Sequence, residues 1–118
     1  VHGARQRREA KKIAYAIANS NLVKAAFFGG DPNWGRIISA IGSAGVALRP
    51  EKVKVFMGNV PIFADGQGAG GSGKRLQEIM AHSPIQVTVE IGAGDKEFSL
   101  CTADLSFEYV KINAHYHT

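Results

Sequence analysis

The sequence has a single cysteine, no long apolar run, and no signal-peptide pattern at its start. Because one cysteine cannot form a disulfide within the chain, the composition suits a reducing compartment, and Cys101 is expected to be a small buried apolar side chain. No stretch approaches the roughly 20 consecutive apolar residues that cross a membrane. We therefore expect a soluble protein of the cytoplasm with no membrane partner.

Acidic residues are scarce in the first half of the chain. Residues 1–50 carry eight Lys or Arg against two acidic residues, whereas residues 51–118 carry six against eight. The basic residues crowd the first predicted helix, at Arg5, Arg7, Arg8, Lys11 and Lys12. Such a cluster could contact phosphates, but no nucleic-acid motif or interleaved aromatic residue accompanies it. A solvated helix face is therefore favoured over a nucleic-acid interface.

The remaining composition, 45% hydrophobic and 20% charged over 118 residues, is typical of one globular domain covering residues 1–118. Hydrophobic spacing predicts helices over residues 6–18, 31–41 and 74–81. It predicts strands over residues 22–28, 53–57, 60–64, 85–91 and 97–102, with a short helix or turn at 105–109 and a last strand at 110–112. The irregular order of helices and strands predicts an α+β fold, a mixed β-sheet with helices packed on one face.

The segment FFGGDPNWGRI, residues 27–37, combines a glycine pair with a helix start. Asp31 is a good N-cap and Pro32 suits the first helical position, so we expect the helix to begin at Asp31 with Trp34 in the core. Asn33 and Arg36 fall on other faces near the helix start, where anions and carboxylates can bind. Capping alone would also explain this pattern, without any ligand.

The glycine-rich run GQGAGGSGKR, residues 66–75, has the glycine and lysine spacing of a phosphate-binding loop between a strand and a helix. A magnesium-holding Ser or Thr should follow the lysine, but position 75 is Arg, which repels a divalent cation. A surface loop is therefore favoured, and a nucleotide-binding module is the alternative function. His115 and His117 alternate near the end of the chain, but without Cys or carboxylate neighbours they predict no metal site.

The last fifteen residues, DLSFEYVKINAHYHT, combine apolar anchors with Asn113, which can donate and accept hydrogen bonds, and Thr118, which offers a hydroxyl and, as a chain end, a carboxylate that could meet an ammonium group. Satisfying the backbone of a turn would equally explain Asn113.

Four stretches, VHGA, NSNLVKAA, DPNWGR and YVKINAHY, occur in the order found in the β chain of the ornithine acetyltransferase family, which this sequence resembles nearly throughout. The family includes bifunctional arginine-biosynthesis enzymes and glutamate N-acetyltransferases. The resemblance implies an enzyme that cleaves itself into α and β chains and exposes a Thr nucleophile. That Thr takes the acetyl group from N-acetylornithine and passes it to glutamate through an acyl-enzyme.

The resemblance also implies which parts of the enzyme this sequence holds. No Ala-Thr dipeptide of the family's cleavage type occurs in it, so the nucleophile is expected outside this chain and no catalytic residue within it. The chain would be the C-terminal part of a β chain, inactive alone and completed by the α chain and the rest of the β chain in an α/β heterotetramer.

Asn113 and Thr118 match the family's C-terminal substrate-binding Asn and Thr, with the same spacing, and are expected to hold the amino-acid part of the substrate. Asn33 and Arg36 are expected to shape the site. The family often has an acidic residue where this chain has Gly30, so no carboxylate role transfers there. No cofactor is expected.

Overall fold

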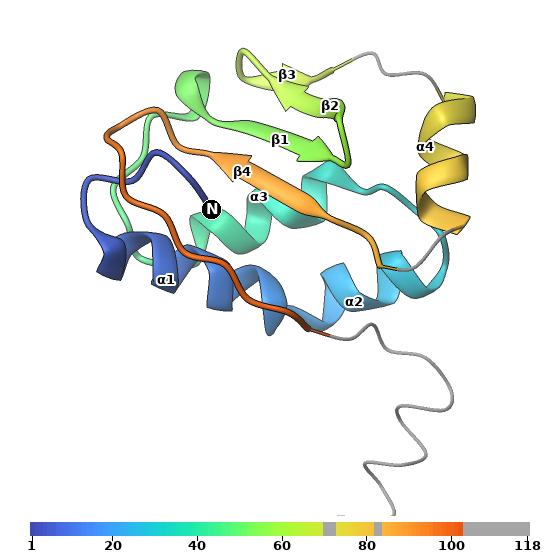
Figure 1. Cartoon of the computed structure of the whole chain (residues 1–118), viewed down its shortest axis with the longest axis horizontal. Helices are drawn as coiled ribbons and strands as arrows, with labels where there is room; N and C mark the ends of the chain where they lie inside the picture. The colour runs from blue at the N-terminus through green and yellow to red at the C-terminus, as the bar shows by residue number, and fades with distance from the viewer. Residues whose placement is uncertain (70–72, 82–83, 103–118) are drawn as a thin grey trace, which may run out of the picture.

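A computed structural model describes residues 1–69, 73–81 and 84–102, and Figure 1 shows three helices below and behind a twisted sheet and a fourth beside one end of it. The helices are α1 (Arg7–Ala18), α2 (Asn21–Phe28), α3 (Trp34–Gly42) and α4 (Gly73–Ala81), with a short 3₁₀ turn at Pro50–Lys52. The strands are β1 (Lys54–Met57), β2 (Val60–Ala64), β3 (Gln67–Gly68) and β4 (Val87–Glu90). None of the helices within these ranges is long and apolar enough to cross a membrane.

The four strands form one sheet in the order β3-β2-β1-β4, and every neighbouring pair is antiparallel. The turn at residues 58–59 joins β1 to β2, and Gly58 has the positive φ of 59° that such a tight turn requires. The parallel component of the expected mixed sheet is an isolated bridge between His2 and Glu90, beside the edge strand β4. The α+β fold is confirmed.

The core lies between the sheet and the helices. Alternate residues of β1, Val55 and Met57, are completely buried, because successive side chains of a strand point to opposite faces of the sheet. The helices contribute residues at helical spacing, which places one apolar stripe toward the sheet. The largest fully buried side chains are Ile13, Ile37, Ile41, Val55, Met57 and Val89.

Residues 22–28 form α2, so the prediction of a strand there is wrong. Ser20 starts this helix, because its hydroxyl accepts a hydrogen bond from the amide of Val23 at 3.2 Å. A continuous apolar run shows no period, so its hydrophobicity cannot distinguish a buried strand from a short helix.

The predicted strand over residues 97–102 is also absent. The segment is extended, but it runs beside the N-terminal residues and then along α1 (Figure 1). Val1 and Phe98 exchange backbone hydrogen bonds of 2.8 and 2.9 Å, and the Phe98 ring lies 5.9 Å from that of Tyr15. Thr102 donates to the carbonyl of Ala18 at 3.4 Å. A helix offers no free ladder of backbone groups, so most of this segment cannot pair as a strand.

The other expectations have mixed outcomes. Helix α4 is confirmed, and three of its side chains, Leu76, Ile79 and Met80, pack against the core. Cys101 is exposed, so the prediction of a buried thiol is wrong, because its segment lies on the outside of α1 rather than inside a sheet. The elements predicted at residues 105–109 and 110–112 lie outside the described residues.

Candidate functional site

The turn between α2 and α3 is built around Asn33. Its side-chain oxygen accepts a hydrogen bond from the amide of Arg36 at 3.0 Å, and its side-chain amide donates to the Asp31 carboxylate at 3.2 Å. Asn33 is therefore the N-cap of α3, and the prediction that the helix begins at Asp31 is wrong. The amide of Asn33 bonds to the Asp31 carbonyl at 2.8 Å. This tight turn is centred on Pro32, whose fixed φ suits it, and it delays the helix by two residues.

Arg36 links this turn to the preceding helix by a hydrogen bond. Its guanidinium donates to the carbonyl of Leu22 at 2.9 Å, in the first turn of α2. The contact links the first turn of α3 to the first turn of α2. Asn33 and Arg36 thus hold the geometry of the two helices, and both side chains are only partly exposed.

Trp34 lies at the surface of the same turn and is 40% exposed, so its predicted place in the core is wrong. One side of its ring packs against Phe63, with ring centroids 5.3 Å apart. The indole also lies over Gly68, where a Cβ would come within 2.7 Å of the ring nitrogen. Only glycine allows the strand to pass this close to the tryptophan.

The glycine-rich segment therefore begins under the Trp34 ring. Asp65 and Gly66 turn the chain with positive φ values of 55° and 76°, β3 follows, and α4 begins at Gly73. Arg75, the residue that departs from the phosphate-binding pattern, lies 3.6 Å from the carboxylate of Glu78. Residues 70–72 lie outside the described part of the chain, so nucleotide binding stays a prediction from the sequence alone.

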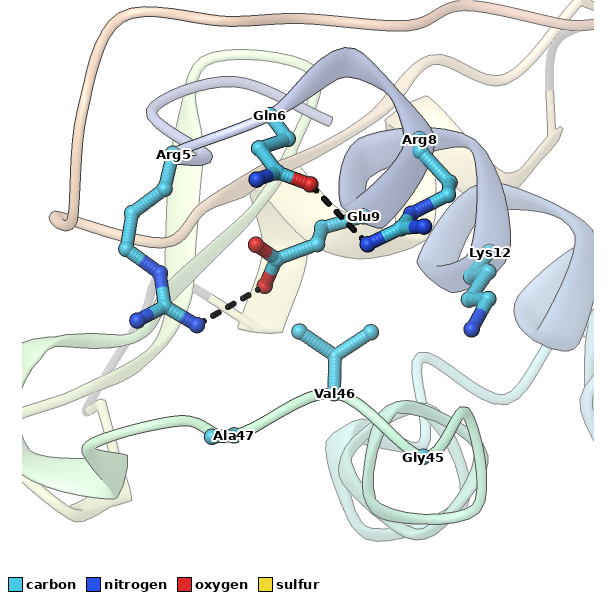
Figure 2. A pocket seen from close by; sticks show the side chains of 8 residues that line it. All are labelled: Arg5, Gln6, Arg8, Glu9, Lys12, Gly45, Val46 and Ala47. Carbon is cyan, nitrogen blue, oxygen red and sulfur yellow. Dashed lines mark hydrogen bonds and ion pairs between the residues drawn. The ribbon is translucent and has the colours of Figure 1, made fainter.

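A basic cavity of about 380 Å³ lies between the start of α1 and the loop that follows α3 (Figure 2). The Arg5 guanidinium lies 3.1 Å from the Glu9 carboxylate, and the Arg8 guanidinium donates to the Gln6 side chain at 3.1 Å. Val46 points into the cavity from the loop. The remaining lining residues are Lys12, Gly45 and Ala47. The sequence showed the basic cluster but not this loop, which reaches it only through folding.

The cluster behaves as the solvated face predicted for it, because its five basic residues are all exposed. A second cavity of about 350 Å³ adjoins the first and shares Arg5 with it, while adding Arg49 and Lys52. The Glu9 carboxylate partly offsets the charge of Arg5, and Arg8 already donates to the neutral Gln6 side chain. The cavity could hold an anion only by competing with these contacts.

The amino end of the chain carries a small cluster of ionisable groups. The His2 ring lies 2.8 Å from the Glu97 carboxylate, and both side chains are largely exposed. Burial lowers the pKa of the Val1 amino group, an effect that the nearby carboxylates of Glu97 and Glu90 oppose. Among the residues that the structure describes, no group of three or more His, Cys, Asp or Glu side chains could hold a metal ion.

The two residues expected to bind substrate, Asn113 and Thr118, lie outside the described residues, and so do His115 and His117. Their roles stay predictions from the sequence.

Comparison with known proteins places the chain in a family. The family model described as "ArgJ family" matches residues 1–118. The "Arginine biosynthesis bifunctional protein ArgJ" of Syntrophotalea carbinolica is 42% identical over 119 residues, which cover 100% of this chain and 30% of that protein. The "Glutamate N-acetyltransferase" of Methanocaldococcus jannaschii is 43% identical over 126 residues, covering 100% of this chain and 31% of that protein.

A solved structure agrees with these matches. The crystal structure of the arginine biosynthesis bifunctional protein argJ from Bacillus halodurans superposes with a TM-score of 0.89 at 33% identity, covering 98% of this chain and 55% of that one. This chain spans about 30% of the length of its curated relatives. The match over the full chain and the shared fold lead to one conclusion: the chain belongs to the ArgJ family.

Proposed function

We propose that this chain is the C-terminal domain, residues 1–118, of an enzyme of arginine biosynthesis that transfers an acetyl group from N-acetylornithine to glutamate. The observation that carries the proposal is the family match over every residue of the chain. One relative named as the bifunctional arginine-biosynthesis protein and one named as glutamate N-acetyltransferase have similar sequence identities to this chain, 42% and 43%. The motifs DPNWGR and YVKIN support the same assignment.

The reaction proposed has two acyl-transfer steps at a Thr that this chain does not contain. The Thr hydroxyl attacks the acetyl carbonyl of N-acetylornithine, its proton passes to the leaving amine, and ornithine departs. The amino group of glutamate then attacks the acetyl ester, which releases N-acetylglutamate and regenerates the hydroxyl. Covalent catalysis of this kind needs no cofactor and divides one difficult transfer into two easier ones.

In this proposal the chain positions and binds rather than reacts. Asn113 and Thr118 hold the polar amino-acid part of the substrate through hydrogen bonds. Asn33 and Arg36 shape the site from a distance, because the bonds of Arg36 to Leu22 and of Asn33 to Asp31 hold α2 and α3 in place. The α chain and the remainder of the β chain complete an α/β heterotetramer in the cytoplasm, and the chain alone is inactive.

The test is an assay of acetyl transfer from N-acetylornithine to glutamate, run with the chain alone and with the chain completed by the rest of the enzyme. We expect transfer only from the completed enzyme. In it, Asn113→Ala and a chain ending at Tyr116 should raise the Michaelis constants of both substrates. Asn21→Ala, at an exposed asparagine of α2, is the matched control and should leave them unchanged. Unchanged constants in the Asn113→Ala and truncated enzymes would contradict the assigned roles, and absence of transfer would contradict the function.

A further inference from the structure

Helix α2 carries apolar side chains outside its buried side as well as on it. Val23 and Ala26 point into the core and are 3% and 4% exposed. Away from the core, the exposed residues Leu22, Ala25 and Phe28 recur every third residue and form a surface called here the α2 outer face. Leu22 is 62% exposed and Phe28 is 57% exposed. Asn21 and Lys24 also lie on the outer side of α2, but two large apolar side chains left exposed on one short helix mark a candidate contact surface.

The adjoining helix shows the contrast. The outward side of α1 carries Lys and Arg, and the extended segment 96–102 lies along it (Figure 1). Phe98 in that segment packs against Tyr15, and the Arg7 guanidinium lies 4.9 Å from its ring centre. The described cover ends at Thr102, which bonds to Ala18 at the junction of α1 and α2. Among the residues that the structure describes, the α2 outer face has no comparable cover.

We propose that the α2 outer face is the surface through which this chain packs against the remainder of an ArgJ-family polypeptide. The inference rests on the proposed function, in which the chain works as part of a larger enzyme. Its curated relatives are more than three times as long as the matched region, and 45% of the solved relative's chain lies beyond the part matched here. A large polypeptide surface is therefore available in each relative to cover an apolar helix.

The neighbouring charges indicate the chemistry of the partner surface. Lys24 lies one helical turn before Phe28, and the Arg36 guanidinium lies at the backbone of Leu22. Cations thus border the apolar face on two sides. A complementary surface would present apolar side chains at its centre and carboxylates at its rim, the usual arrangement of a protein interface.

The test uses the 118-residue chain and the Syntrophotalea carbinolica relative from which the matched region has been deleted, with binding measured by calorimetry. Leu22→Lys and Phe28→Lys place a charge in the proposed contact and should each weaken binding at least about 30-fold, as loss of a central interface residue does. Ser39→Lys adds the same charge at an exposed position of α3 and should change binding less than about threefold.

A further variant distinguishes a loss of binding from a loss of folding. Ala25→Lys adds a charge at the middle of the α2 outer face and removes no packed side chain, so it should fold normally by circular dichroism and still weaken binding. The proposal would be overturned if the unmodified chain failed to bind. It would also be overturned if Leu22→Lys, Ala25→Lys and Phe28→Lys all bound as tightly as the unmodified chain. Two other occupants are also tested. Self-association of the chain that Phe28→Lys abolishes would assign the face to a second copy. Faster amide exchange in α2 after removal of residues 103–118 would assign it to that segment.

Acetyl transfer measured on the same mixtures separates this inference from the proposed function. A complex that forms, depends on the α2 outer face and transfers no acetyl group would support the contact and contradict the activity. Transfer that persists unchanged in Leu22→Lys, Ala25→Lys and Phe28→Lys would support the activity and overturn the contact.

Discussion

The N-cap of α3 allows a direct test of the turn geometry, because the sequence and the structure assign it to different residues. Asp31 is the better capping residue by sequence position, yet the oxygen that meets the amide of Arg36 at 3.0 Å belongs to Asn33. We predict that Asn33→Ala destabilises the protein more than Asp31→Ala does. The two residues are two positions apart and share one hydrogen bond, so they form a closely matched pair.

The size of the effect follows from the contacts that each variant removes. Asn33→Ala leaves a first-turn amide of α3 without its partner, which costs about 1 kcal/mol of unfolding free energy. That corresponds to a fall of roughly 4 °C in melting temperature for a domain of this size. Asp31 is exposed and its carboxylate accepts a hydrogen bond from the exposed Asn33 side-chain amide, so Asp31→Ala should cost less than about 0.5 kcal/mol.

Denaturant titration followed by tryptophan fluorescence is a suitable assay, because Trp34 is the only tryptophan and follows the cap directly. We expect the midpoint to fall for Asn33→Ala with an unchanged dependence on denaturant, since the exposed area on unfolding is the same. Asn33→Ser keeps a capping oxygen and should recover most of the loss. An equal or larger loss in Asp31→Ala would refute the assignment of the cap to Asn33.

Two further predictions concern Gly68, beside this turn, and Cys101, on the segment that lies along α1. Gly68→Val should displace the Trp34 indole, because even a Cβ would lie 2.7 Å from the ring nitrogen, and should destabilise the protein by about 1–3 kcal/mol with a shifted emission maximum. Gly42→Ala meets no atom within 4 Å and should leave the emission unchanged, which makes it the control. Cys101 should react with a thiol reagent in the folded protein at a rate close to that of the denatured chain, because it is exposed. Protection by several orders of magnitude would contradict its position.

Local patterns were sufficient where an element's own residues decide its form. Both strands of the β1–β2 hairpin were predicted, over residues 53–57 and 60–64, and the second has the predicted bounds, Val60–Ala64. Helices α1 and α4 were predicted to within one residue at each end from apolar residues at helical spacing. Family membership was also predicted from short motifs, because their residues and order are themselves the signal.

The same reasoning failed where two local signals compete. Ser20 can end one helix or begin the next, and its bond to the Val23 amide decides for the second role. Asp31 and Asn33 are both capping residues, and the turn at Pro32 decides between them. In each case the choice depends on which backbone amide the side-chain oxygen meets. The sequence identifies the side chain that can accept the hydrogen bond, but not the amide that donates it.

By itself, the sequence determined the α+β class, the hairpin, most of the helices and the family, because these follow from residue spacing and identity. Only the tertiary structure decided that residues 97–102 lie along α1, that Trp34 covers Gly68 at the surface, and that the α2 outer face remains outside the core. The physical reason is that burial is settled between segments far apart in the chain. Hydrophobicity indicates which side chains favour burial, but the packing of the folded chain determines which of them fit into the core.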